Sequence, residues 1–221
     1  MQLHVNRFQC ITTAKKAIPP AKLRGYLGGV FYDHPLIHNH IDGKLRYQYP
    51  VIQYKILDDV PTIVSVVEGN DVVQELFTEI TEIRLMNRTY PVLEKNLKQT
   101  AYEYGGSDSM HRYELLTPWI PFNEENYGQY KKLNTNKQRS DKLKSILIGN
   151  ILSQAKGLDY WIEQQLEVKL ALHQTDRPVE YKNVQFIGFE GYFKVNFNLP
   201  DYLGIGKAVS HGFGTIKRME S

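Results

Sequence analysis

The most informative stretch for chemistry lies between residues 34 and 49, where three of the chain's seven histidines fall within seven positions. His38 and His40 are separated by one residue, and Lys44 and Tyr47 follow them closely. Histidine is the commonest general acid or base, and a lysine can hold a phosphate and stabilise charge that develops on it. The segment therefore contains the groups needed to cleave RNA without a metal. One group deprotonates the ribose 2′-hydroxyl, which attacks the adjacent phosphate, and another protonates the departing 5′-oxygen.

Two other interpretations of the histidine pair stay open on the sequence alone. On an extended segment, His38 and His40 would project to the same side, which also suits zinc or copper with His34 as a third ligand. No carboxylate cluster accompanies the pair, which argues against a hydrolytic two-metal centre. We therefore expect neither a metal nor another cofactor. A structural role, with His38 hydrogen-bonded in a loop, is the remaining alternative.

A second informative stretch near the C-terminus contains two Gly-x-Gly pairs, formed by Gly204, Gly206, Gly212 and Gly214. Successive N–H groups of such a loop can form an anion-binding nest, and Lys207 and His211 lie between the pairs. Only seven residues follow Gly214, too few for a dinucleotide-binding unit, and Gly206-Lys207-Ala208 lacks the Ser or Thr of a P-loop. The loop therefore predicts contact with a polymeric phosphate, meaning nucleic acid. The alternative is a glycine-rich turn that closes a β-domain.

Basic residues also gather between positions 131 and 144, where Lys137, Arg139 and Lys142 are the candidates for contact with an RNA backbone. A solvated helix face is the alternative. Lys22 and Tyr26 or Tyr32, on a predicted first helix, could contribute to the chemistry.

The glycine pattern, Gly-Ile-Gly, five residues and Gly-Phe-Gly close to the C-terminus, resembles the signature loop of the RAMP superfamily. More narrowly, it resembles that of the CRISPR RNA-processing endoribonucleases. His38-Asn39-His40 with Lys44 and Tyr47 is similar to an arrangement in one branch of that family. The resemblance implies metal-independent cleavage of precursor repeat RNA, giving a 2′,3′-cyclic phosphate and a 5′-hydroxyl, with His40 and then His38 as the main catalytic groups.

The resemblance also implies CRISPR repeat RNA as the partner, with other CRISPR effector subunits or a homodimer as further possibilities. A non-catalytic RAMP subunit that binds guide RNA in a larger complex is the rival interpretation. Cleavage of a repeat RNA would separate the two.

The elements that must position these residues indicate an α+β fold of two ferredoxin-like (RRM-like) units in tandem, residues 1–90 and 91–221. The first unit would carry the histidines and the second the glycine loop. Alternation and capping signals predict strands over 3–11, 47–57, 60–67, 80–86, 98–104, 111–117, 164–173 and 192–199, and helices from Pro19-Pro20 and over 70–79, 123–133 and 140–156. The hairpin turn is expected at Asp58-Asp59, and Ser140 and Asp141 are the capping candidates for the last helix.

Composition limits the possible classes of protein. The hydrophobic content of 42% is usual for a globular protein. The net charge is only +3, so any nucleic-acid site must be a local patch. The single cysteine allows no disulfide within the chain, and the N-terminal residues contain no apolar signal-peptide segment. We expect a cytoplasmic protein without a membrane span.

Overall fold

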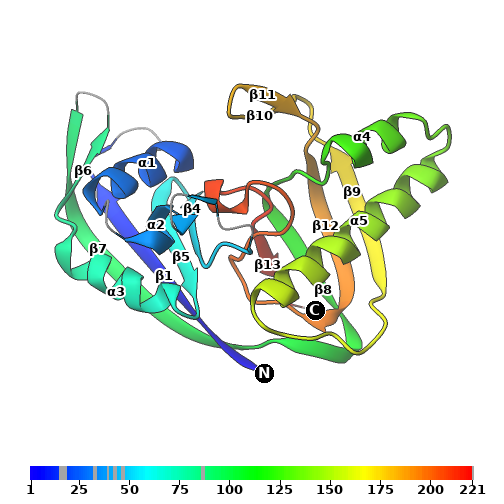
Figure 1. Ribbon diagram of the computed structural model, residues 1–221, viewed down its shortest axis with the longest axis horizontal. Helices are drawn as coiled ribbons and strands as arrows, with labels where there is room; N and C mark the ends of the chain where they lie inside the picture. The colour runs from blue at the N-terminus through cyan, green and yellow to red at the C-terminus, as the bar shows by residue number, and fades with distance from the viewer. Residues whose placement is uncertain are drawn as a thin grey trace. The chain divides into compact units, whose positions relative to one another are not determined.

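The computed structural model describes residues 1–14, 19–31, 34–38, 40–41, 44–45, 48–85 and 88–220. The chain forms two compact units. One comprises Gln2–Tyr102 together with Ser210–Gly212, and the other comprises Met1, Glu103–Val209 and Phe213–Ser221. Both units are built on antiparallel sheets with helices, which confirms the α+β prediction (Figure 1).

The first unit has a five-stranded sheet in the order β4-β5-β1-β7-β6. Its elements follow the β-α-β-β-α-β sequence of a ferredoxin-like unit, with α2, β2 and β3 inserted after the first helix. An additional strand, β7, lies between β1 and β6 in the sheet. Their bounds are β1 Gln2–Thr12, α1 Pro20–Val30, α2 Pro35–His38, β2 His40–Ile41, β3 Lys44–Leu45, β4 Ile52–Leu57, β5 Val60–Val66, α3 Gly69–Glu79, β6 Glu82–Leu85 and β7 Arg88–Glu103.

The helices α1 and α3 cover one face of this sheet (Figure 1). Phe8 of β1 packs edge-on against Phe77 of α3, with ring centroids 5.6 Å apart. The hairpin of β4 and β5 turns at Asp58 and Asp59, as expected, and both residues adopt positive φ angles, 51° and 62°. Asp tolerates this left-handed conformation better than most residues, which explains the position of the turn.

The second unit has a four-stranded sheet in the order β13-β8-β12-β9, which is the ferredoxin-like order. Helix α5 lies across one face of it, and a loop from 199 to 215 stands where a ferredoxin-like unit would carry its second helix (Figure 1). The bounds are β8 Gly105–Trp119, α4 Glu124–Lys131, α5 Asn136–Gly157, β9 Val168–Gln174, β10 Val179–Tyr181, β11 Val184–Phe186, β12 Phe189–Asn198, the 3₁₀ turn η1 Val209–His211 and β13 Ile216–Arg218.

Several boundaries differ from those expected from the sequence. Strand β4 begins at Ile52 and not at residue 47, and the strand expected over 98–104 is the end of β7, in the sheet of the first unit. Tyr90 and Pro91, placed at the domain boundary, lie inside β7, where Pro91 pairs with Glu82, and the two units divide after Tyr102. Helix α5 begins four residues earlier than expected. Its N-cap is Thr135, whose hydroxyl accepts from the Gln138 N–H while the Gln138 side chain accepts from the Thr135 N–H, each at 3.2 Å. This reciprocal capping box satisfies two helix-terminal donors without Ser140 or Asp141.

No helix among the described residues is long and apolar enough to cross a membrane.

The interior of the first unit contains an ionisable side chain. Lys55 on β4 is fully buried, and burial lowers its pKa from 10.5 to about 7. A buried ammonium is disfavoured because a low-dielectric interior solvates it poorly.

We expect Lys55→Met to change how stability depends on pH. Between about pH 7 and pH 9 the unfolded chain keeps the Lys55 proton that the folded chain has released, so the free energy of unfolding rises with pH by up to about 1.4 kcal/mol per unit. Lys55→Met removes that contribution, and urea unfolding across this range measures it. Lys98→Met, at an exposed position of β7, is the matched control and should keep the slope. Identical slopes in the wild type and Lys55→Met would contradict the buried-lysine account.

Candidate functional site

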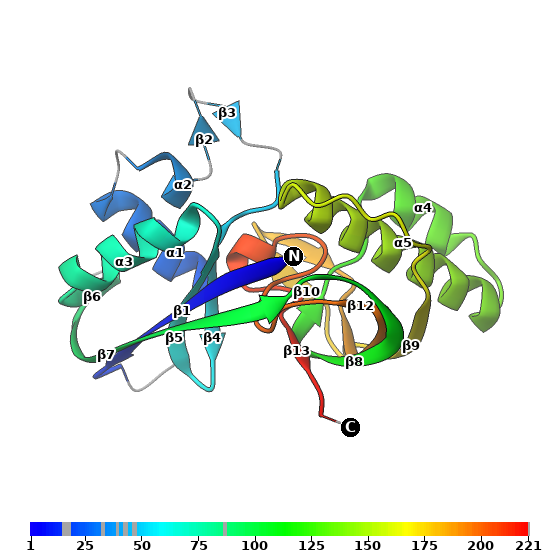
Figure 2. The ribbon, with the colours of Figure 1, turned by 90° about the horizontal axis from the view of Figure 1, so that it is seen from below.

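The histidine segment forms three short consecutive elements of the first unit. His38 is the last residue of α2, His40 is the first of β2, and Lys44 is the first of β3. In the β2–β3 hairpin His40 pairs with Leu45 and Ile41 pairs with Lys44, and Figure 2 shows this hairpin beside α2. The backbone therefore brings His40 and Lys44 to neighbouring strands. Tyr47, the fourth catalytic candidate, lies outside the described residues.

Helix α2 is anchored on β4 through Tyr54. Ile37 is buried, with 2% of its surface exposed, and its carbonyl accepts a long hydrogen bond of 3.4 Å from the Tyr54 hydroxyl. Burial raises the pKa of Tyr54, partly offset by the charge of Arg24, so the phenol stays protonated and able to donate. This contact holds the residue directly before His38.

The tip of the C-terminal loop approaches the same tyrosine. An added Cβ on Gly212 would lie 3.1 Å from the Tyr54 carbonyl oxygen and 3.0 Å from Cγ of Pro20. Gly212 also adopts a φ of +91°, which favours glycine. Gly212 and α2 therefore both lie against Tyr54 within the first unit.

His211 at this tip is held on both ring nitrogens. Its Nε2 lies 2.9 Å from Nη1 of Arg24, and its Nδ1 lies 3.1 Å from the Ser210 hydroxyl oxygen. Arginine can only donate, so Nε2 must accept, and the neutral ring then carries its proton on Nδ1 and donates it to Ser210. The guanidinium of Arg24 therefore places a cationic group beside the neutral His211 ring. Sequence reasoning missed it, because 187 positions separate the two residues.

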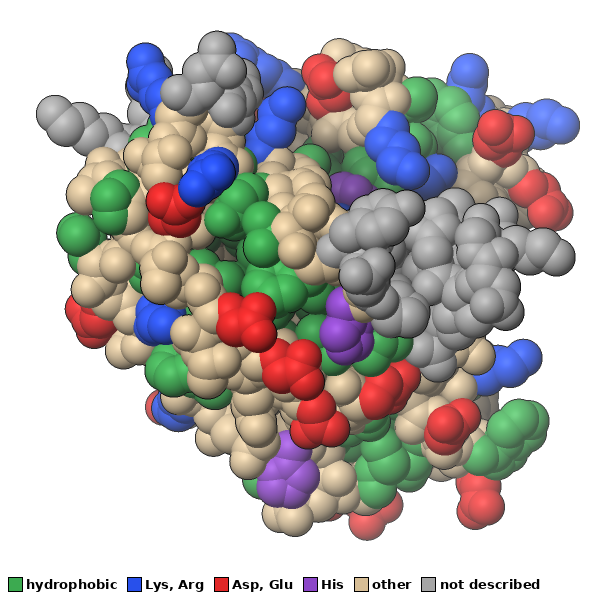
Figure 3. All heavy atoms as spheres, turned by 60° about the vertical axis from the view of Figure 1, so that its left-hand side comes forward, with side chains coloured by type: hydrophobic (Ala, Val, Ile, Leu, Met, Phe, Trp, Pro, Cys, Tyr) green, Lys and Arg blue, Asp and Glu red, His purple; other side chains and the backbone are tan. Residues whose placement is uncertain are grey.

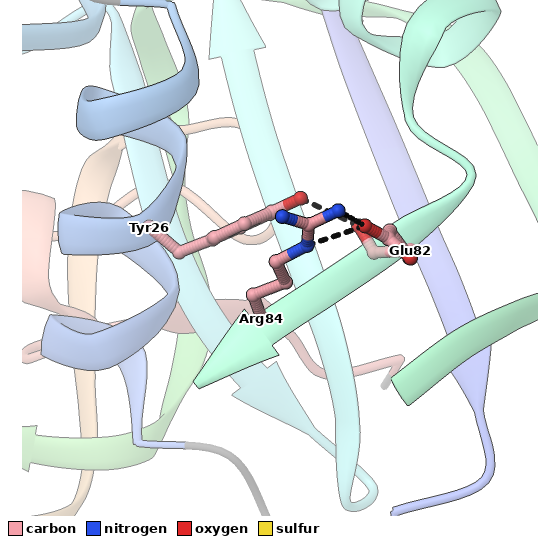
Figure 4. Close-up of polar contacts among 3 residues, drawn as sticks. All are labelled: Tyr26, Glu82 and Arg84. Carbon is pink, nitrogen blue, oxygen red and sulfur yellow. Dashed lines mark hydrogen bonds and ion pairs between the residues drawn. The ribbon is translucent and has the colours of Figure 1, made fainter. Parts of the chain in front are cut away.

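Tyr26, considered for a chemical role, instead fastens α1 to β6 (Figure 4). Its hydroxyl donates to the Glu82 carbonyl at 2.9 Å, while Arg84 binds the Glu82 carboxylate at 2.5 Å. Burial and the Glu82 charge raise the pKa of Tyr26, and Arg84 opposes them. Lys22 is exposed on α1, and Tyr32 lies outside the described residues.

The four loop glycines each have a steric reason to be glycine. A Cβ on Gly204 would meet Val209 at 2.7 Å, and one on Gly206 would meet the Trp119 indole at 2.5 Å. Gly214, at φ +62°, passes so close to the backbone of Ile205 that a Cβ would overlap its carbonyl oxygen. The pattern therefore encodes tight packing of the loop.

The amides of this loop are largely used within the chain. The N–H of Ile205 donates to Gly214, that of Gly214 to Pro118 and that of Lys207 to Ile120, at 2.8 to 3.0 Å. The anion-binding nest expected from the sequence does not form at these three amides. Positive charge comes instead from the exposed side chain of Lys207, whose ammonium lies 4.5 Å from the Phe186 ring centroid.

We expect Gly214→Ala to lower the free energy of unfolding by at least about 1–2 kcal/mol, because the added Cβ meets the Ile205 carbonyl at a positive φ. Gly128→Ala is the matched control, since a Cβ there meets nothing within 4 Å. It lies in α4 and should be neutral or stabilising by up to about 1 kcal/mol. Denaturant unfolding of both variants gives the comparison, and equal stability would show that Gly214 is not required for packing.

Of the basic candidates on α5, two also hold the turn between α4 and α5. Arg139 donates to the Leu133 carbonyl at 3.2 Å and lies over the Tyr130 ring, and Lys142 donates to Gln129 at 2.5 Å. Lys137 is exposed. These cations are therefore partly oriented by local contacts.

The surface carries charge in local groups. In Figure 3, Lys and Arg side chains gather towards the top of the view, and Asp and Glu side chains run through its middle and lower part. Among the described residues, no three His, Cys, Asp or Glu side chains are grouped as metal ligands. The positive charge of this face is thus distributed over separate patches and does not form one uniform field.

Tandem ferredoxin-like units, the second closed by a glycine-bearing loop in place of a helix, define a RAMP-type protein. The sequence comparisons are more specific. Residues 1–103 match the Cas6b N-terminal domain and residues 105–219 match the Cas6b C-terminal domain. The chain belongs to the Cas6b family.

Individual relatives agree with this assignment. A crystal structure of Cas6b is 35% identical with a TM-score of 0.89, covering 99% of this chain and 100% of that one. A second, described as the CRISPR RNA processing endoribonuclease Cas6b, is 32% identical with a TM-score of 0.78 and the same coverage. The uncharacterized protein MJ0978 of Methanocaldococcus jannaschii is 44% identical over 146 residues, which are 66% of this chain and 98% of that protein.

Proposed function

We propose that this chain is a CRISPR RNA-processing endoribonuclease that cuts precursor repeat RNA by metal-independent attack of a ribose 2′-hydroxyl. The observation that carries the proposal is the match along 99% of the chain to a Cas6b described as a CRISPR RNA processing endoribonuclease. The RNA-binding surface includes Lys207, His211 and the α5 cations Lys137, Arg139 and Lys142. The loop glycines keep Lys207 and His211 in position.

In the proposed reaction, one histidine takes the proton of the 2′-hydroxyl, and the oxygen forms a bond to the adjacent phosphorus. The bond from phosphorus to the 5′-oxygen breaks, and that oxygen receives a proton from a second group. The products are a 2′,3′-cyclic phosphate and a 5′-hydroxyl. His40 and His38 are the proton-transfer groups, and Lys44 and Tyr47 stabilise the charge on the phosphate.

Arg24 and His211 extend this site. Tyr54 links the neighbourhood of α2 to the tip of the C-terminal loop, so an RNA phosphate near His38 would lie within the field of the Arg24 guanidinium. Because that guanidinium donates to His211, the arginine is oriented before RNA binds. A preoriented cation stabilises developing negative charge without reorganisation during the reaction.

A non-catalytic RAMP subunit is the second candidate, because such a subunit would share the fold and the loop. It would bind guide RNA in a larger complex and would not cut RNA. Incubation with a candidate repeat RNA in EDTA, followed by end-group analysis, separates the two functions. A 2′,3′-cyclic phosphate at a unique position supports the endoribonuclease. Association with other CRISPR subunits or as a homodimer stays a prediction.

We expect His40→Ala to lower the single-turnover cleavage rate by roughly 10²–10⁴-fold and to leave RNA affinity nearly unchanged, because it removes a proton-transfer group. Cleavage time courses and binding titrations with the same repeat RNA measure the two effects. His173→Ala, which removes an exposed histidine of β9, is the matched control and should cut at the wild-type rate. Full activity in His40→Ala would move the chemistry to His38 or another group.

Replacing the 2′-hydroxyl with hydrogen at the nucleotide 5′ of the cut should abolish cleavage, since the nucleophile is gone. Binding should persist, because phosphate contacts dominate affinity and the remaining strand keeps its RNA character. The modified RNA should then inhibit cleavage of the natural RNA competitively. A metal-activated water would still cut it, so cleavage at the usual position, stopped by EDTA, would refute the mechanism.

A further inference from the structure

The sheet of the second unit has one face that α5 does not cover. Tyr113, Phe193 and Val195 are buried on the α5 side, and because side chains alternate along a strand, their neighbours Arg112 and Lys194 project to the opposite face. Lys194 is the direct register partner of both Arg112 on β8 and Lys169 on β9. These three residues, the cationic row, cross three adjacent strands and span roughly 10 Å.

Such a row is electrostatically unfavourable by itself. Like charges directly opposite one another on neighbouring strands destabilise a sheet. In the described part of the chain, no carboxylate lies within ion-pairing distance of Lys169, Lys194 or Arg112. The fold therefore keeps three positive charges in direct register without a neutralising partner.

Other charges on this face are balanced. Glu114 is the register partner of Lys217, and His173 is that of Glu190, with 3.9 Å between His173 Nε2 and the Glu190 carboxylate. The cationic row is thus an exception on a face that otherwise pairs opposite charges. An anion bound across the row would remove the repulsion.

One end of the row opens into a pocket of about 210 Å³. Arg112 and Lys194 line it together with Met110, Met219, Arg218 and Glu220. The Arg112 guanidinium lies 3.6 Å from the centroid of the Tyr192 ring, and its Nε–H has no hydrogen-bond partner. The two methionines provide an apolar wall, and the charged groups provide donors and one acceptor, a combination that suits a nucleobase attached to a phosphate.

His111 also lines this pocket. Its Nδ1 lies 2.6 Å from Nη2 of Arg218, and its Nε2 lies 2.8 Å from the Ser107 hydroxyl oxygen. Arginine donates, so Nδ1 accepts and the Nε2 proton goes to Ser107. Arg218 also donates to Asn198 at 3.2 Å, which leaves its guanidinium in a defined position at the pocket.

We propose that this face is a second contact site for the RNA substrate: the cationic row binds consecutive phosphates of a single-stranded segment, and the adjoining pocket takes one nucleotide. Single-stranded RNA fits because only an unpaired base can leave its stack and enter a pocket. Phosphate contacts of this kind position a strand without reading its sequence. The inference rests on the proposed function for the identity of the ligand.

The test measures binding, not cleavage. The full chain is titrated with repeat RNA carrying the single 2′-deoxy substitution, over a series of salt concentrations. Lys169→Ala/Lys194→Ala should reduce the steepness of log K against log salt by about 1.4, since each phosphate contact to a single strand contributes about 0.7, and weaken binding on the order of tenfold at low salt. Both lysines are exposed, so the fold should be retained, which circular dichroism checks.

Lys98→Ala/Lys156→Ala is the matched control, because it removes two exposed lysines that lie outside the row. An unchanged slope in Lys169→Ala/Lys194→Ala, or an equal change in the control, would overturn the inference. An equal loss of affinity for a fully double-stranded RNA would overturn the single-strand assignment. Failure of the proposed function has a different signature: the wild type would not cleave unmodified repeat RNA in EDTA, whatever the slope.

Discussion

The close passage of the backbone at Gly214 over Ile205 is the constraint on which the C-terminal loop depends. A side chain at that point would overlap the Ile205 carbonyl, and the surrounding amides are already paired with Gly214, Pro118 and Ile120. A loop fixed in this way needs no helix to complete the second ferredoxin-like unit. Its glycines therefore act first on packing, and any effect on RNA follows from the side chains that the packing holds in place.

The tip of this loop connects its packing to the candidate catalytic site. Ser210–Gly212 belong to the first unit, where Gly212 approaches Tyr54 and His211 accepts from Arg24. Tyr54 also donates to Ile37, directly before His38. One buried tyrosine thus connects the neighbourhood of the histidine segment to that of the loop.

Charge on this protein is organised in small groups, consistent with a net charge of only +3. In the first unit, Arg24 and His211 form one group. In the second unit, the α5 cations form another, and Lys169, Lys194 and Arg112 form a third. Several separate patches favour a ligand that carries many phosphates along a chain. A single compact anion would need only one of them.

Local pattern in the sequence was enough to predict much of the architecture. Alternation of apolar residues marked β12, and strand-forming composition marked β1 and the β4–β5 hairpin, because both signals depend on residues close together in the chain. The glycine spacing and the His38/His40 pair indicated the family for the same reason. The limits of β7 and α5 were less clear, since Pro91 suggested a boundary and Ser140 a cap where tertiary pairing and Thr135 decided otherwise.

Other features depend on contacts between distant residues. No local pattern shows that Arg24 meets His211, that a Gly214 side chain would strike Ile205, or that Lys55 is buried deeply enough to lower its pKa to about 7. The cationic row likewise exists only through the registers of β9 with β12 and of β12 with β8. The sequence by itself determined the repeated fold and the residue types available for chemistry. The tertiary structure decided which of them meet, because strand register and close packing join residues that the chain keeps far apart.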